Sequence, residues 1–94
     1  METLKGLKRK AVLLALINKM NQTGSWSGET HIQKTVYFLQ TVCKVPTGYD
    51  FILYKYGPFS FDLRDELSEM LTNNLLKIKL QTYPFGSSFV LGDL

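Results

Sequence analysis

Apolar residues recur at helical spacing in three stretches of the chain, and this pattern predicts three amphipathic helices. The expected helices cover residues 4–20, 30–43 and 60–73. Each stretch places apolar side chains three or four positions apart, so that they share one face toward a common core. The residues concerned are Leu13, Leu16, Ile17 and Met20 in the first helix, Ile32, Val36, Leu39 and Cys43 in the second, and Leu63, Leu67, Met70 and Leu71 in the third.

Local signals indicate where the second and third helices begin. Thr30 is followed three positions later by Gln33. This spacing has the form of a capping box, in which the Thr hydroxyl accepts a backbone N–H and the Gln side chain reaches back. Ser60 or Asp62 is expected to cap the third helix.

Alternation of apolar and polar residues predicts the strands. Residues 49–55 are expected to form one strand, which a turn at Gly57-Pro58 ends. Residues 76–81 predict a half-buried strand, with Leu76, Ile78 and Leu80 on its inner face, and residues 89–91 are expected to return beside it after a turn at 84–88. The order helix, helix, strand, helix, β-hairpin predicts an α+β, winged-helix-like fold, in which residues 1–94 form a single domain.

Composition is that of an ordinary globular protein, with 45% hydrophobic and 20% charged residues. The longest aliphatic run, residues 11–17, is far shorter than the ~20 residues of a membrane span. No small-residue cleavage site follows it, so we expect a cytoplasmic protein without a membrane partner. The single cysteine, Cys43, fits a reducing compartment. It is expected to be a buried structural thiol on the second helix, whose apolar face is widened by Phe38 and Val42.

The sequence contains no complete catalytic apparatus. His31 and Cys43 are the only residues of their types. Twelve positions along one helix separate them by roughly 18 Å, so they form neither a zinc site nor a nucleophile pair. No phosphate-binding glycine motif is present. We therefore expect a protein that is not an enzyme and uses no cofactor and no metal. The acidic residues of the third helix are expected to form a solvated face near its N-terminus, namely Asp62, Asp65, Glu66 and Glu69.

The net charge of +3 is concentrated in the first third of the chain. A winged helix normally places its third helix in the major groove of DNA. Here that helix carries four carboxylates and one arginine, a combination that the DNA phosphates repel. A DNA-binding transcriptional regulator is therefore the alternative function, and it would use cations of the first helix and of the wing: Lys5, Lys8, Arg9, Lys77 and Lys79.

Residues 49–61 hold six of the twelve aromatic residues of the chain. A domain of this size has one small core and buries only somewhat over ~60% of the surface that its unfolded chain exposes. Some of these rings are therefore expected to face outward as anchors for a partner protein, although Tyr37 and Phe61 are slightly favoured as core residues. The alternative occupant of the same strand is a second copy of the chain. The predicted partner-binding residues are Lys34, Tyr37, Tyr54, Tyr56, Gly57, Pro58 and Phe59.

Two motifs stand in sequence within this region, HIQKTVYFLQ and GYDFILYKYGPFSFDL. They resemble the SocA-like and YwgA-like bacterial proteins, whose shared module is the Panacea domain. That group has a helix of the form x-L-Q-K-x-x-Y-F-x-Q and then an extended segment that closes on Y-G-P. Ile32 stands where the group more often has Leu. The matching residues are Gln33, Lys34, Tyr37, Phe38, Gln40, Tyr56, Gly57 and Pro58.

The resemblance covers about residues 10–75. It implies an antitoxin or adaptor, a non-catalytic protein that neutralises a partner toxin by direct contact or delivers it to a protease. Members of the group often look like regulators without binding DNA, which agrees with the acidic third helix. They are usually longer than this chain, so the resemblance also implies that residues 1–94 correspond to the N-terminal part of a longer module. The leading hypothesis is a protein-binding module.

Overall fold

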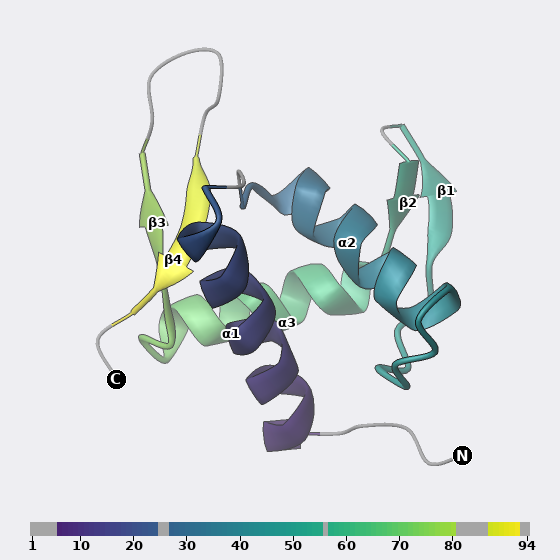
Figure 1. The fold of residues 1–94 in the computed structure, drawn as a ribbon, viewed down its shortest axis with the longest axis horizontal. Coiled ribbons are helices and arrows are strands. Elements are labelled where there is room, and N and C mark those ends of the chain that lie inside the picture. The colour runs from purple at the N-terminus through teal and green to yellow at the C-terminus, as the bar shows by residue number, and fades with distance from the viewer. Residues whose placement is uncertain (1–5, 25–26, 56, 81–86, 93–94) are drawn as a thin grey trace.

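The computed structural model describes residues 6–24, 27–55, 57–80 and 87–92. This part of the chain contains three helices and two antiparallel strand pairs, arranged as a small α+β fold (Figure 1). The elements are α1 (Gly6–Gln22), α2 (Glu29–Thr41), β1 (Ile52–Tyr54), β2 (Gly57–Phe59), α3 (Phe61–Thr72), β3 (Leu76–Lys79) and β4 (Ser88–Leu91).

The predicted α+β class and the three predicted helices are confirmed, whereas a winged-helix arrangement is not. The described strands form two separate sheets, and the pairs β1–β2 and β3–β4 lie at opposite ends of the molecule (Figure 1). The single strand expected at residues 49–55 is wrong. Only Ile52–Tyr54 form a strand, and this strand pairs with Gly57–Phe59. Gly57 and Pro58 therefore belong to strand β2 and not to a turn. Lys55, which was expected to be the last residue of the strand, lies in the turn.

The core lies where the three helices meet, and the predicted stripes supply most of it. α1 also packs against β4, which brings the C-terminal strand onto the same core. The buried apolar residues are Leu13, Ile17, Met20, Ile32, Val36, Tyr49, Leu63, Leu67, Met70, Leu76 and Phe89. Leu16 and Leu71, which were predicted for these stripes, are partly buried beside them.

The apolar face predicted for the second helix is not buried toward its C-terminal end. Phe38 and Val42 are exposed, and Cys43 is exposed rather than a buried thiol. The physical reason is visible in Figure 1: α1 lies across α3 rather than across α2, and α2 extends away from α1 toward the β1–β2 hairpin. The side chains on that extension lack a second layer to cover them.

The expected capping box at the start of α2 is also wrong. Gly28 occupies the N-cap position, and no side chain caps the helix there. Gln33 is instead buried and forms two hydrogen bonds with the backbone of Ser60: its Oε1 accepts the Ser60 N–H at 2.9 Å, and its Nε2 donates to the Ser60 carbonyl at 3.0 Å. Ser60 caps α3 as predicted, since its Oγ accepts the N–H of Leu63 at 3.2 Å.

Gln40, two helical turns after Gln33, binds the backbone of Tyr49 in the same way. Its Oε1 accepts the Tyr49 N–H at 2.9 Å, and its Nε2 donates to the Tyr49 carbonyl at 2.9 Å. The Thr47 hydroxyl donates to the same oxygen of Gln40. Two glutamines of α2 thus hold both ends of the segment that carries the β1–β2 hairpin, and we call these contacts the glutamine clamps.

The β3–β4 hairpin is attached to the core at its base. Leu76 and Phe89 are buried, and Ser27 binds Phe89 through its Oγ, which donates to the Phe89 carbonyl at 2.6 Å. Ile78 and Leu80 are exposed, so the expected burial of one face of this strand is wrong beyond Leu76. The reason is that the hairpin projects past the helices (Figure 1). Positions 81 and 84–86 of the expected strand and turn lie outside the described residues.

The first glutamine clamp predicts a large effect of Gln33→Leu on stability. Leucine fills the space but leaves the buried N–H of Ser60 without a partner, whereas the Ser60 C=O keeps its bond from the N–H of Arg64. The substitution is expected to lower the free energy of unfolding by about 2 kcal/mol. Urea unfolding followed by circular dichroism measures the change. Gln22→Leu, at an exposed position of α1, is the matched control and is expected to stay within about 0.5 kcal/mol of the wild type. Equal losses in both variants would contradict the clamp.

Candidate functional site

The β1–β2 hairpin lies against α2 on the side away from α1 (Figure 1). Its register pairs Ile52 with Phe59, Leu53 with Pro58 and Tyr54 with Gly57. Gly57 has a φ of +120°, and a Cβ at this position would lie 3.2 Å from Cε of Lys34. Glycine therefore allows both this backbone conformation and the close approach of the Lys34 side chain.

Three aromatic rings form a contiguous cluster, which we call the aromatic triad: Tyr54, Phe59 and Phe61. The ring centroids lie 5.3 Å apart for Tyr54 and Phe59, 5.0 Å for Phe59 and Phe61, and 6.1 Å for Tyr54 and Phe61. The guanidinium carbon of Arg64 lies 5.0 Å from the Phe61 centroid, within the range of a cation–π contact. The triad thus presents apolar ring surface next to a fixed positive charge.

Two hollows adjoin the hairpin. A hollow of about 250 Å³ is lined by Glu29, Thr30 and Gln33 of α2, by Arg64 of α3 and by the hairpin residues Tyr54, Gly57, Pro58 and Phe59. A smaller one of about 120 Å³ is lined by Tyr37, Phe51, Ile52, Leu53 and Pro58. Pro58 contributes to both, so the hairpin separates two concave surfaces, and charged residues, Glu29 and Arg64, line only the larger one.

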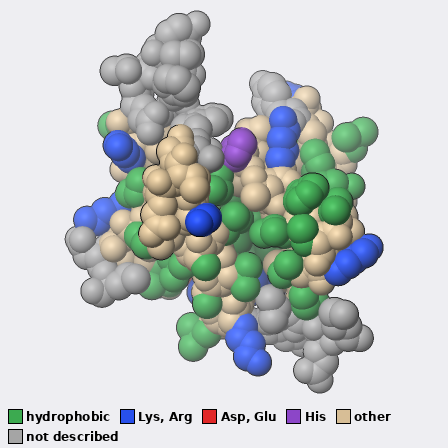
Figure 2. Space-filling model, viewed as in Figure 1, with side chains coloured by type: hydrophobic (Ala, Val, Ile, Leu, Met, Phe, Trp, Pro, Cys, Tyr) green, Lys and Arg blue, Asp and Glu red, His purple; other side chains and the backbone are tan. Residues whose placement is uncertain are grey.

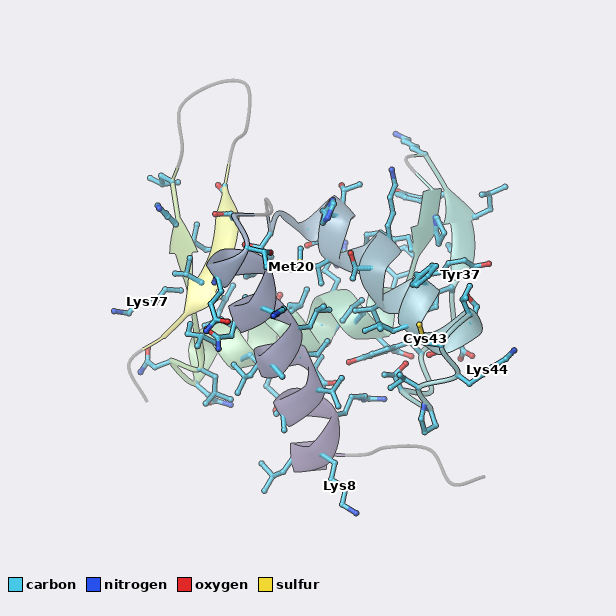
Figure 3. All side chains as sticks on the ribbon, viewed as in Figure 1. Lys8, Met20, Tyr37, Cys43, Lys44 and Lys77 are labelled. Carbon is cyan, nitrogen blue, oxygen red and sulfur yellow. The ribbon has the colours of Figure 1, made fainter. Side chains whose placement is uncertain are left out.

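Tyr37 belongs to the smaller hollow. Its ring meets that of Phe51 edge to face, with centroids 5.2 Å apart, and it points to the hairpin side of α2 (Figure 3). Tyr37 and Phe61 were both favoured as core residues, yet both are exposed at the surface. The reason is that the buried stripe of α2 includes Val36, one position before Tyr37, and the buried stripe of α3 begins at Leu63, two positions after Phe61.

The structure places six of the seven predicted partner-binding residues around the hairpin: Lys34, Tyr37, Tyr54, Gly57, Pro58 and Phe59. The seventh, Tyr56, lies outside the described residues. Sequence reasoning did not assign Phe61 and Arg64 to this surface. They are three positions apart in the predicted third helix, and side chains at this spacing are neighbours on a helix surface. The sequence could therefore have predicted that Arg64 lies beside Phe61.

The acidic face expected on α3 is wrong at Glu66. This carboxylate is only 8% exposed, and it accepts hydrogen bonds from the Tyr49 hydroxyl at 2.6 Å, from Arg9 Nε at 2.6 Å and from Lys10 Nζ at 3.2 Å. Lys10 also pairs with Glu69 at 3.1 Å. We call this group, which joins α1 to α3, the Glu66 junction.

Burial and hydrogen bonding act against each other on the Glu66 carboxyl. Burial raises its pKa, but the hydrogen bonds from Tyr49, Arg9 and Lys10 together outweigh burial, so the pKa lies below its usual range. Burial and the neighbouring carboxylate raise the pKa of the Tyr49 hydroxyl, which stays protonated and donates. Hydrogen bonds to Glu69 and Glu66 raise the pKa of Lys10.

The cations predicted for DNA binding are divided by the structure. Arg9 is part of the Glu66 junction, and its guanidinium also lies over the Tyr49 ring at 4.4 Å from the centroid. Lys8, Lys77 and Lys79 are exposed, with Lys8 at the start of α1 and the other two on β3 (Figure 3). Lys5 lies outside the described residues. The use of Arg9 inside the fold weakens the DNA-binding alternative.

Neither a metal-binding cluster nor a membrane-spanning helix occurs among the described residues. In residues 6–24, 27–55, 57–80 and 87–92, no group of three or more His, Cys, Asp or Glu side chains is placed to hold a metal ion. No helix in the described part of the chain has the length and apolar character needed to cross a membrane. His31 is exposed in the first turns of α2.

Comparison of the chain with protein-family models, with curated proteins and with solved structures gives no match. The resemblance to the Panacea group therefore rests on the two sequence motifs and stays a prediction.

The Glu66 junction predicts a pH-dependent effect of Glu66→Gln. At pH 7 the substitution removes the carboxylate that pairs with Arg9, and we expect the free energy of unfolding to fall by about 2 kcal/mol. Because the pKa of Glu66 is lowered by folding, its contribution is complete above the unfolded-state pKa of ~4.3 and is lost as the pH falls through the folded-state value. The difference between wild type and variant should therefore shrink toward pH 3 in urea titrations.

Glu69→Gln is the matched control on the same helix. Glu69 is 56% exposed and pairs only with Lys10 among the described residues, so its replacement is expected to cost less than about 1 kcal/mol at pH 7. Equal costs for the two variants, or a Glu66→Gln deficit that is the same at pH 3 as at pH 7, would show that the carboxylate of Glu66 does not hold α1 on α3.

Proposed function

We propose that this chain is a non-catalytic protein-binding module of the antitoxin or adaptor type, which acts by direct contact with a partner protein. The contact is made by the hairpin surface, defined as Lys34, Tyr37, residues 52–54, residues 57–59, Phe61 and Arg64. The observation that carries the proposal is the placement of exposed apolar side chains. Five of the ten large exposed hydrophobic residues in the described chain belong to this surface, namely Tyr37, Ile52, Leu53, Tyr54 and Phe61. Two more, Phe38 and Val42, lie on α2 or directly after it.

Such clustering supports a docking surface because single exposed apolar residues are ordinary, whereas a contiguous group of them marks an interaction site. Figure 2 shows hydrophobic side chains gathered on the right of the molecule, over α2 and the β1–β2 hairpin, with Lys and Arg side chains around them. Tyr54 and Arg64 are of the residue types that dominate binding energy in protein interfaces.

The antitoxin or adaptor class, with a toxin or a protease as partner, comes from the resemblance to the Panacea group. The residues of the two motifs have a common physical role, which supports that resemblance. Gln33 and Gln40 form the glutamine clamps that hold the hairpin-bearing segment on α2. Gly57 gives the hairpin its close contact with Lys34, and Pro58 lines both hollows. The motif positions are thus those that build and present the hairpin surface.

Substitution of the aromatic triad tests the proposed function. The immobilised chain is used to capture proteins from a nuclease-treated lysate of its source cells, and the affinity of the recovered protein is then measured with variants. Tyr54→Ala and Phe59→Ala are each expected to weaken binding by at least about tenfold, because interface anchors contribute roughly 2 kcal/mol.

Ile78→Ala is the matched control, since Ile78 lies in the other hairpin and its 45% exposure equals that of Tyr54 at 46%. It is expected to leave the affinity unchanged, and circular dichroism confirms that all variants fold. Two results would reject the proposed function: unchanged binding in both triad variants, or capture that disappears when nuclease is added and so depends on nucleic acid.

A further inference from the structure

The outer edge of β1 lies open. β1 pairs with β2 alone among the described strands, and it is the outermost strand on its side of the molecule, with β2 between it and α2 (Figure 1). All three residues of β1 are exposed, and Leu53 reaches 89%. The strand contains no charged residue and no proline, which are two of the devices that keep natural edge strands from pairing. An apolar, unprotected edge is a template for one more strand.

The position of Pro58 fixes which backbone groups this edge offers. In an antiparallel pair, facing residues alternate between those that exchange two N–H···O bonds and those that exchange none. Pro58 faces Leu53 and has no N–H, so these two residues form a pair without mutual hydrogen bonds. The N–H and C=O of Leu53 therefore point away from β2, toward the open edge. Within the described part of the chain, neither group forms a backbone hydrogen bond to a turn, loop or helix end.

We propose that the partner protein binds as an extended segment, which adds a third strand to the hairpin at the β1 edge and pairs with the N–H and C=O of Leu53. This inference rests on the proposed function and states the mode of binding at the same surface. Main-chain hydrogen bonds supply affinity in this mode, while pockets for alternate side chains supply specificity. The hollow lined by Tyr37, Ile52 and Leu53 lies beside the edge and takes one apolar side chain of the added strand.

Charge indicates an acidic segment as the occupant. Lys55 follows β1 directly, and Lys44 points outward beyond the end of α2, on the same side as the hairpin (Figure 3). On the face shown in Figure 2, the described residues present Lys and Arg but no Asp or Glu side chain. A second copy of the chain, which carries a net charge of +3, would bring charge of the same sign to this face. Asp50 lies before β1, whereas Lys55 lies directly after it. Repulsion from Asp50 and attraction to Lys55 favour an added strand whose acidic residues lie next to Lys55.

The test uses two synthetic peptides of about ten residues, one alternating Val with Glu and one alternating Val with Lys, added to the isotope-labelled full chain. Hydrogen exchange of individual amides is followed by NMR. With the Glu peptide, exchange of the Leu53 amide is expected to slow by at least about tenfold, which corresponds to a mostly occupied edge. The Lys peptide is expected to leave that amide unchanged.

Two substitutions at one position separate the backbone from the side chain. Leu53→Pro removes the outward N–H without removing a hydrogen bond to β2, because edge strands tolerate proline where the N–H faces solvent. It is expected to abolish binding of the Glu peptide, whereas Leu53→Ala keeps the N–H and should weaken binding less than about threefold. A third form, with the amide at residue 53 replaced by an ester, removes the N–H without restricting φ and is expected to behave like Leu53→Pro.

Several outcomes overturn strand addition. Equal losses for Leu53→Ala and for the ester form indicate a side-chain contact only. A Leu53 amide that exchanges freely at millimolar Glu peptide excludes an added strand. Protection that grows with protein concentration in the absence of peptide assigns the edge to a second copy. If the captured partner is lost with Phe59→Ala but binds the ester form normally, strand addition fails and the proposed function stands. If Tyr54→Ala and Phe59→Ala both leave capture unchanged, the proposed function itself fails.

Discussion

The glutamine clamps are the contacts on which the rest of the surface depends. A carboxamide side chain carries one acceptor and two donors, so a single Gln can satisfy both backbone groups of one residue as a neighbouring strand would. Gln33 does this for Ser60, and Gln40 does it for Tyr49. Two positions seven residues apart lie on one side of a helix, and α2 therefore holds an extended segment by its two ends. The hairpin between those ends needs no core of its own.

A hairpin held only at its ends keeps apolar side chains exposed, as all three residues of β1 are. An isolated two-stranded hairpin is at best marginally stable in water. The β1–β2 hairpin is small, and β2 is its contact with α2. The Glu66 junction adds a second contact at the Tyr49 end of the segment. Gln40 binds the backbone of Tyr49, and Glu66 binds its hydroxyl. Rigid ends with an exposed middle reduce the ordering entropy that binding would otherwise lose.

Sequence patterns predicted the helices well because their signal is local. The stripe of Leu63, Leu67 and Met70 is buried as expected, and Ser60 caps its helix. The errors concern the partners of polar side chains. Gln33 in capping-box spacing and Glu66 on an acidic helix face both have ordinary local explanations, and only the approach of distant segments, Ser60 and Arg9, makes them buried. Periodicity carries no information on such long-range approach. For the same reason the exposure of Phe38 was not predictable, because it depends on how α2 extends away from α1.

The candidate site could likewise be predicted only in part from the sequence. The density of aromatic residues indicated that some rings would face outward, since the small core could not contain every ring, and Tyr54 and Phe61 are exposed. The density of aromatic residues does not indicate which way the backbone N–H and C=O groups of the strand point, because their direction follows from the register of β1 and β2. Because Pro58 faces Leu53, one residue rather than its neighbours directs its peptide groups outward, and a shift of register by one residue would turn them inward. Register in turn is constrained by Gly57, whose lack of a Cβ allows α2 to approach the hairpin. The chemistry offered by the β1 edge is therefore a consequence of how the hairpin is seated on α2, and it cannot be read from the residues of the strand alone.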